Sequence, residues 1–247
     1  MKKILTLCML MLFVSIKLIN AQDIHFGAKA GLNLSYIHPM LNTGKSSDLL
    51  PGFHVGGMVE FDINTSVSIA PEILYSTMGA SEAIDQTITN TSGFLFTESI
   101  TGTSKTTLNY IQLPIMAKVK MSNGLNFFAG PYVGMFMNGN SVSTMTVKTT
   151  TNFTGTPVTA SGDTISTVKL DSATNKIDFG IGFGLGYEFP FGLGFSARYM
   201  LGFPNIFKGG YTYPDTNSPY PRTITQGPYG NNGVLQVSLS YMFGMNK

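Results

Sequence analysis

The 247-residue sequence has no tryptophan, one cysteine and few charges, with only 11% of its residues Asp, Glu, Lys or Arg. A single cysteine forms no disulfide within the chain, so the fold depends on packing and hydrogen bonds. The net charge of +2 is too small for the basic footprint of a nucleic-acid-binding protein, and we expect no nucleic-acid partner. No stretch after residue 21 is apolar over the ~18 residues that a membrane-spanning helix needs. A helical membrane protein is therefore excluded.

The first residues have the composition of a secretory signal peptide. Lys2 and Lys3 form a positive segment, residues 4–16 are apolar, and Ala21 precedes the expected cleavage site. The only cysteine, Cys8, lies inside this segment, so the mature chain has no thiol. We predict an exported protein with a signal peptide over residues 1–21 and a single domain over residues 22–247.

Beyond residue 21, apolar side chains alternate with small or polar ones at a period of two, which is typical of β-strands. Eight segments carry this pattern: residues 24–36, 53–61, 66–77, 109–121, 125–137, 176–189, 192–203 and 234–243. Short turns alternate with long connections, and the long ones are residues 37–52, 78–108, 138–175 and 204–233. In an up-and-down sheet, this alternation places every tight turn and both chain ends at the same end.

The distribution of bulk between the two strand faces favours a membrane barrel over a soluble one. Large apolar side chains fill one face of the segments, and an eight-stranded barrel is too narrow to hold them inside. The other face is mostly Gly, Ser and Asn, which suits a narrow polar lumen. We therefore predict an all-β fold, an eight-stranded antiparallel up-and-down transmembrane β-barrel. The alternative is a soluble secreted barrel of lipocalin type that binds an apolar ligand.

Two features predict how the barrel sits in the membrane. Outer-membrane barrels have short periplasmic turns, so we expect extracellular long connections and periplasmic termini in the bacterial outer membrane. The Thr-rich runs at residues 141–150 and 164–170 alternate like strands, and they predict a hairpin that continues beyond the membrane.

Three motifs give a resemblance that covers essentially the whole mature chain. They are FGAKAGLN (26–33), YIQLPIMAKVK (110–120) followed by FFAGPYVG (127–134), and FGIGFGLGYEF (179–189) followed by GFSARYMLG (194–202). In this order and spacing, they resemble the PorT-like outer-membrane β-barrel family of the Bacteroidetes. The resemblance implies an eight-stranded outer-membrane barrel. One branch of that family is tied to protein secretion, so a secretion or assembly role is one implied option.

Charged residues recur on the small, polar strand face, which we expect to line the lumen. They are Lys29, Glu60, Glu72, Lys118, Lys120, Asp178, Glu188 and Arg198. Charges in a low-dielectric lumen are tolerated only when they are paired. We therefore predict that Glu72 pairs with Arg198 or a lysine, and that Lys120 pairs with Glu60 or Glu188. We expect this network to be an internal polar plug, and the alternative is a narrow ion or small-solute pore.

The segment DFGIGFGLGYEF (178–189) has glycines at four alternate positions: Gly180, Gly182, Gly184 and Gly186. Glycine-rich loops that bind phosphate are followed by the N-terminus of a helix. Here Pro190 and Phe191 lead into another strand instead. We interpret the glycines as a lumen-facing groove that leaves room for long side chains such as Arg198.

The sequence gives little support for catalysis or metal binding. The three histidines are widely spaced and lack ligand partners at metal spacing, so we expect no metal and no cofactor. They are His25, His38 and His54. Ser46, Ser47 and Asp48 follow His38 in a set that would suit a hydrolase, but serine and aspartate are ordinary loop residues. We predict a protein that is not an enzyme.

The last long connection is rich in tyrosine and proline. Aromatic side chains favour contact surfaces, although they are equally expected at the membrane rim. The candidates for contact with a glycan, lipopolysaccharide or a protein are Tyr211, Tyr213, Tyr220 and Tyr229. We expect a monomer in contact with membrane lipid, with a structural, surface-interaction or secretion-associated role. Its partner would be a surface protein, a secretion-system protein or a glycan.

Overall fold

The structure is a computed structural model that describes residues 24–39, 48–90, 96–153, 156–208, 212–213, 222–223 and 230–244. Its strands are β1 (Ile24–Pro39), β2 (Leu50–Asn64), β3 (Val67–Asn90), β4 (Phe96–Lys120), β5 (Leu125–Phe153), β6 (Thr156–Lys169), β7 (Ile177–Glu188), β8 (Leu193–Gly202), β9 (Thr212–Tyr213), β10 (Arg222–Thr223) and β11 (Gly230–Phe243). Within these ranges, no helix is long and apolar enough to cross a membrane. The predicted signal peptide, residues 1–21, lies outside the described residues.

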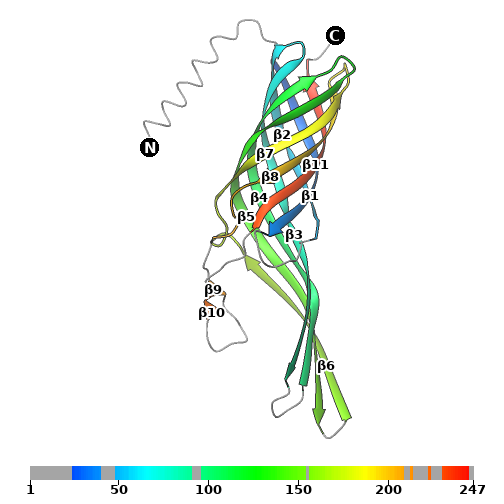
Figure 1. Ribbon diagram of the computed structural model, residues 1–247, viewed down its shortest axis with the longest axis vertical. Coiled ribbons are helices and arrows are strands. Elements are labelled where there is room, and N and C mark those ends of the chain that lie inside the picture. The colour runs from blue at the N-terminus through cyan, green and yellow to red at the C-terminus, as the bar shows by residue number, and fades with distance from the viewer. Residues whose placement is uncertain are drawn as a thin grey trace, which may run out of the picture.

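Eight of the strands close into a barrel. They pair in the order β4-β3-β2-β1-β11-β8-β7-β5, and β5 also pairs antiparallel with β4, which completes the ring (Figure 1). Each of the eight predicted segments contributes one strand of this ring. The eight-stranded antiparallel up-and-down barrel predicted from the sequence is therefore confirmed. Full closure leaves no free strand edge within the barrel wall.

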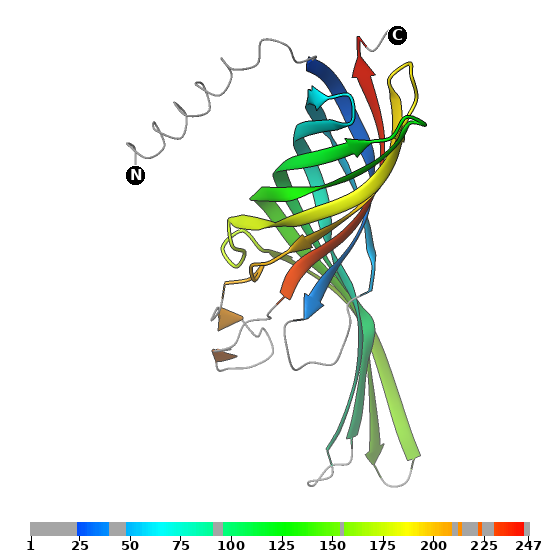
Figure 2. The ribbon, with the colours of Figure 1, turned by 45° about the horizontal axis from the view of Figure 1, so that its top comes forward.

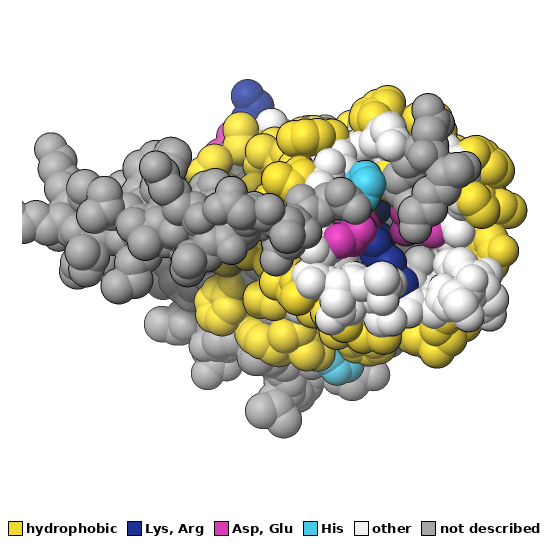
Figure 3. All heavy atoms as spheres, turned by 90° about the horizontal axis from the view of Figure 1, so that it is seen from above, with side chains coloured by type: hydrophobic (Ala, Val, Ile, Leu, Met, Phe, Trp, Pro, Cys, Tyr) yellow, Lys and Arg dark blue, Asp and Glu magenta, His cyan; other side chains and the backbone are white. Residues whose placement is uncertain are grey.

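Strand alternation sorts the side chains onto two faces. In β7, burial alternates residue by residue, and Phe183 is 52% exposed on the outer face while Asp178 is 3% exposed on the inner face. Seen along the barrel from the short-turn end, hydrophobic side chains form the periphery and charged side chains lie in the central hollow (Figure 3). The barrel thus has an apolar outside and a polar inside.

The short turns lie at one end of the barrel. The connections at residues 65–66, 121–124 and 189–192 share this end with the start of β1 and the end of β11, where Phe26 pairs with Phe243. Gly124 and Gly192 have φ angles of 90° and 92°, a backbone conformation that glycine adopts without steric cost. The turn chemistry thus explains why the connections are tight at this end.

At the opposite end, three barrel strands continue past the barrel and are joined by β6 in a projecting sheet of four strands (Figures 1 and 2). We define the projecting sheet as residues 79–90 of β3, 96–107 of β4, 140–153 of β5, and all of β6, paired in that order. The 14 residues of β6 span roughly 45 Å at ~3.3 Å per residue. The hairpin predicted from the Thr-rich runs is present. The long loop expected over residues 78–108 is instead mostly strand, because its threonines favour extended backbone.

Candidate functional site

The first group of lumen charges lies near the short-turn end of the barrel, where Figure 3 shows charged side chains in a hollow. Lys118 Nζ lies 2.5 Å from a Glu60 carboxylate oxygen and 3.3 Å from one of Glu188. Lys120 Nζ lies 2.6 Å from the other Glu60 oxygen and 2.5 Å from Asp62. Lys120 thus has Glu60 as a partner, one of the two that the sequence analysis proposed. Glu60 is the shared acceptor that joins the two lysines.

The second group lies deeper and is centred on Glu72. This carboxylate forms ion pairs with Lys29 of β1 and with Arg198 of β8, the latter at 2.8 Å. Arg198 is 1% exposed, and its Nε donates a hydrogen bond to Gln236 at 2.5 Å. A guanidinium this deeply buried is tolerated because its charge is compensated. Glu72 therefore ties β1, β3 and β8 together across the lumen.

A third group is a hydrogen-bonded relay that the sequence analysis missed. His54 Nε2 is 2.8 Å from Ser238 Oγ, and His54 Nδ1 is 2.7 Å from Asn33 Oδ1. The same Asn33 oxygen accepts a bond from Gln236 at 3.0 Å, which links the relay to Arg198. Ser238 and His54 both pair with Gly31 of β1, whose missing side chain leaves room for the imidazole. Only the strand register reveals this juxtaposition.

The relay has the order of a nucleophile, a base and an orienting group, as in hydrolases. Its three members are at most 3% exposed, and the Asn33 amide is also bonded to Ser76 and to two backbone carbonyls. A substrate therefore has no route to Ser238 in this conformation. The other set considered from the sequence is not assembled, since His38 is exposed at the end of β1 and Asp48 forms a backbone bridge with Ser81. Ser46 and Ser47 lie outside the described residues.

The glycines of β7 line the lumen opposite long side chains. A Cβ added to Gly184 would lie 2.7 Å from Arg198 Cβ, and one added to Gly182 would lie 2.9 Å from Met116 Cε. Gly180 is similarly close to Tyr132, and Gly186 to Asn126. This is the packing that the sequence analysis proposed for Arg198. The glycines keep the barrel wall thin where the interior side chains are largest.

The long-connection end of the lumen is closed by an apolar seal. Its buried members are Met78, Leu108, Tyr110, Phe136, Leu170, Ile206, Phe207 and Val234. Residues 170–176 and 203–208 fold over this end, held by backbone bonds such as Lys208 N to Ala173 O at 2.8 Å. The lumen is thus charged toward the short turns and apolar toward the projecting sheet.

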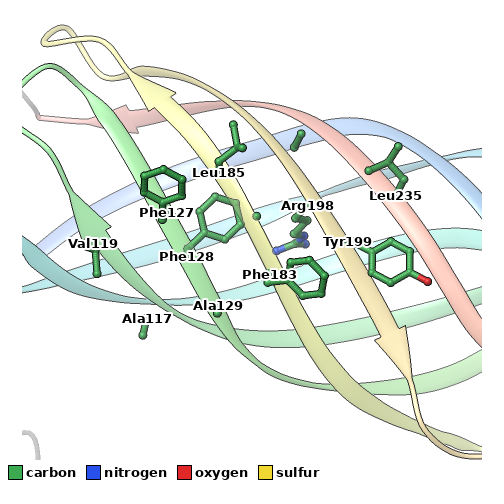
Figure 4. A pocket seen from close by; sticks show the side chains of 12 residues that line it. Ala117, Val119, Phe127, Phe128, Ala129, Phe183, Leu185, Arg198, Tyr199 and Leu235 are labelled. Atoms are coloured by element: carbon green, nitrogen blue, oxygen red, sulfur yellow. The ribbon is translucent and has the colours of Figure 1, made fainter.

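The outer face carries one shallow groove of about 720 Å³ (Figure 4). Its lining includes the small residues Ala117, Ala129 and Ala197 and the aromatic residues Phe183 and Tyr199. These residues belong to the apolar outer belt of the barrel.

The remaining sequence candidates add little to the site. Tyr213 lies in β9 and pairs with Arg222 of β10, while Tyr211, Tyr220 and Tyr229 lie outside the described residues. In the described part of the chain, no three His, Cys, Asp or Glu side chains are grouped to hold a metal ion.

A closed ring of eight antiparallel strands with an apolar outer belt and a charged interior defines a transmembrane β-barrel of the outer-membrane class. The chain belongs to the family described as outer membrane protein beta-barrel domain, whose model matches residues 20–208. It is therefore an integral β-barrel protein of the bacterial outer membrane. The narrower resemblance to PorT-like proteins stays a prediction.

Several solved structures are similar to this chain at low sequence identity. Ail, the attachment invasion locus protein of Yersinia pestis, is 9% identical over 90% of this chain and 99% of its own, with a TM-score of 0.41. Neisserial surface protein A is 14% identical over 91% and 100%, with a TM-score of 0.33. CarO of Acinetobacter baumannii is 12% identical over 88% and 97%, also with a TM-score of 0.33. Similarities this low carry no argument about function. No curated protein matches the chain.

Proposed function

We propose that the protein is a surface-contact protein, in which the barrel is the membrane anchor and the projecting sheet offers a strand edge to a partner outside the cell. The observation that carries this proposal is the edge of β6. One side of β6 pairs with β5, and no described residue pairs with its other side. An unpaired edge presents a row of N–H and C=O groups that form hydrogen bonds with an added strand of another chain.

The sequence of β6 supports an edge that is open to pairing. Natural sheets protect their edges with proline, lysine or bulges. β6 has Pro157 and Lys169 only at its two ends. Between them, Val158 and Ile165 are exposed by 62% and 71%. An extended protein segment suits this edge better than a glycan, because only a peptide supplies the matching backbone ladder.

The closed lumen supports an anchoring role for the barrel. Ion pairs fill its short-turn half, and the apolar seal covers the other end. We further propose that residues 1–21 are removed on export, and that residues 22–247 work as a monomer with periplasmic termini. The resemblance to PorT-like proteins makes a secretion-system protein one candidate partner, beside other surface proteins.

Cysteine labelling tests the orientation, because Cys8 is the only natural cysteine. Thr164→Cys lies in β6, and Ser66→Cys lies in a short turn at the other end. A membrane-impermeant maleimide should label Thr164→Cys on intact cells, and Ser66→Cys only after the outer membrane is opened. The reverse pattern would place the projecting sheet in the periplasm and refute the proposal.

A peptide probe tests the edge itself. The probe is a synthetic peptide of residues 140–153, the segment with which β6 already pairs. The substitution Ile165→Lys in the protein should weaken binding of the peptide to barrels in lipid nanodiscs by about tenfold, because a lysine on an edge strand disfavours pairing with a further strand. The matched control is Thr144→Lys, which lies opposite Ile165 on an inner strand and should change binding by less than about twofold. Equal losses, or no binding to the native protein, would rule out edge pairing.

A further inference from the structure

Asp178 differs from every other lumen charge. Seven of the eight predicted lumen charges form an ion pair, whereas Asp178 pairs with no Lys, Arg or His of the described chain. Its side chain is nevertheless only 3% exposed. Buried carboxylates are paired, bind a metal ion or become neutral, since an isolated charge is too costly to bury. An ionisable group at membrane depth without a partner is a candidate functional site.

Lys176, just before β7, and Arg198 of the neighbouring β8 are engaged elsewhere. Lys176 lies two residues before Asp178, and its Nζ lies 4.7 Å from the centroid of the Phe136 ring. Arg198 is paired with Glu72 and lies opposite Gly184, about 20 Å further along β7. Neither side chain compensates Asp178.

Oxygen atoms gather beside the carboxylate. Tyr132 and Asn232 donate hydrogen bonds to Asp178 Oδ2 at 3.1 and 2.9 Å, while Oδ1 has no hydrogen-bond partner among the described residues. A Cβ added to Gly202 would lie 3.0 Å from Asp178 Oδ1, 3.0 Å from the Tyr132 hydroxyl and 3.2 Å from the Asn232 carbonyl oxygen. Glycine at position 202 therefore keeps open a small space that three oxygens surround.

A fourth oxygen lies at the same level of the barrel. Gln112 of β4 and Asp178 of β7 both pair with Gly134 of β5, and a Cβ added to Gly134 would lie 3.6 Å from Asp178 Cβ and 3.7 Å from Gln112 Cγ. Gln112 is 1% exposed, and its Oε1 also has no partner among the described residues. Carboxylate, carbonyl and hydroxyl oxygens are the ligands that hard cations prefer.

We propose that Asp178, Gln112, Tyr132 and the Asn232 carbonyl form a binding site for one monovalent metal cation of the size of Na⁺. One carboxylate balances one positive charge, whereas a divalent ion would leave a net charge in a low-dielectric site. The bound ion would join β4, β5, β7 and β11 directly beneath the apolar seal.

The test compares barrels that fold with and without the cation. The protein is unfolded in urea and refolded into detergent micelles in equal concentrations of NaCl, CaCl₂ or choline chloride, whose cation is too large for the site. Its melting midpoint is then read from the heat-dependent shift in gel mobility. The native protein should melt roughly 4 °C higher in NaCl than in choline chloride.

Three variants sharpen the result. Asp178→Asn should melt at the same temperature in both salts, while Asp85→Asn, an exposed aspartate of the projecting sheet, should keep the full difference. Tyr132→Phe retains the carboxylate and should require a higher NaCl concentration for half of the rise in melting midpoint. This variant replaces Asp178→Asn in the test if Asp178→Asn does not fold. Equal midpoints for the native protein in NaCl and choline chloride would show that a proton neutralises Asp178. A rise in CaCl₂ alone would overturn the monovalent assignment.

Discussion

At the scale of single residues, Glu72 is the position on which the lumen charges depend most. It compensates Lys29 and Arg198 together, and all three side chains are at most 5% exposed. Glu72→Gln leaves two buried cations without their shared anion, and breaking such a pair costs about 3–5 kcal/mol. We expect the free energy of unfolding, measured by urea titration in lipid vesicles, to fall by this amount.

The matched control for this prediction is a charge outside the lumen. Lys105→Gln removes an exposed charge of the projecting sheet and should change the free energy of unfolding by less than about 0.5 kcal/mol. An effect of Glu72→Gln no larger than that of the control would mean that the lumen charges are solvated rather than compensated by one another.

The glycines of β7 allow a second prediction at this scale. Gly184→Ala places a methyl group 2.7 Å from Arg198 Cβ and against the Ala197 carbonyl, and such overpacking costs about 1–3 kcal/mol. Gly134→Ala also faces the lumen, but its nearest neighbour is 3.5 Å away, so it should be neutral or stabilising by up to ~1 kcal/mol. Denaturant titration of both variants measures the difference. Similar values for the two would contradict the proposed role of Gly184 in making room for Arg198.

The sequence predicted which side chains face the lumen, but it did not predict all of the contacts that they form across it. The period of two turned Glu72 and Arg198 inward, and charge balance suggested that they meet. The period of two did not predict the contact between His54 and Ser238, because this contact depends on how β2 and β11 are aligned with β1. Register follows from the stagger of the whole barrel, which no single segment encodes.

At the scale of elements, the projecting sheet has no apolar core of its own. Cross-strand hydroxyl pairs, such as Ser104 with Ser143 at 3.0 Å and Thr150 with Thr159 at 3.0 Å, add to the backbone ladder. The polar sequence of residues 78–108 predicted a loop, since serine and threonine are common in turns. The β-branched threonines are in strands instead, because β3, β4 and β5 continue together out of the barrel wall and pair with one another along the projecting sheet.

A shortened hairpin tests whether the barrel folds independently of this sheet. Val142 and Thr167 are paired, so residues 143–166 can be replaced by an Asn-Gly turn between them. We expect the melting midpoint of the barrel to change by less than about 4 °C, because no lumen contact is removed. A collapse of barrel stability would show that the projecting sheet is part of the folding unit.

At the scale of the whole molecule, two unlike barriers close the lumen. Ion pairs occupy the half near the short turns, and the apolar seal covers the other end. The strand pattern predicted the first barrier through its inward charges. It did not predict the seal, because residues 170–176 and 203–208 have no strand periodicity, and their packing depends on where the closed barrel places them.

Because the ion pairs and the apolar seal lie in series along the lumen, we predict how variants of each affect ion conductance. The native protein in planar lipid bilayers should show no open-channel steps, because an eight-stranded barrel has room only for its own side chains. Glu72→Gln alone should remain closed, since the seal is intact, and Phe207→Ala alone should remain closed, since the ion pairs still fill the lumen. Discrete conductance in the native protein would favour the narrow pore over the anchor. The double variant should also remain closed, because the ion pairs around Glu60 still occupy the lumen, and conductance in it would show that the Glu72 group is the barrier of the short-turn half.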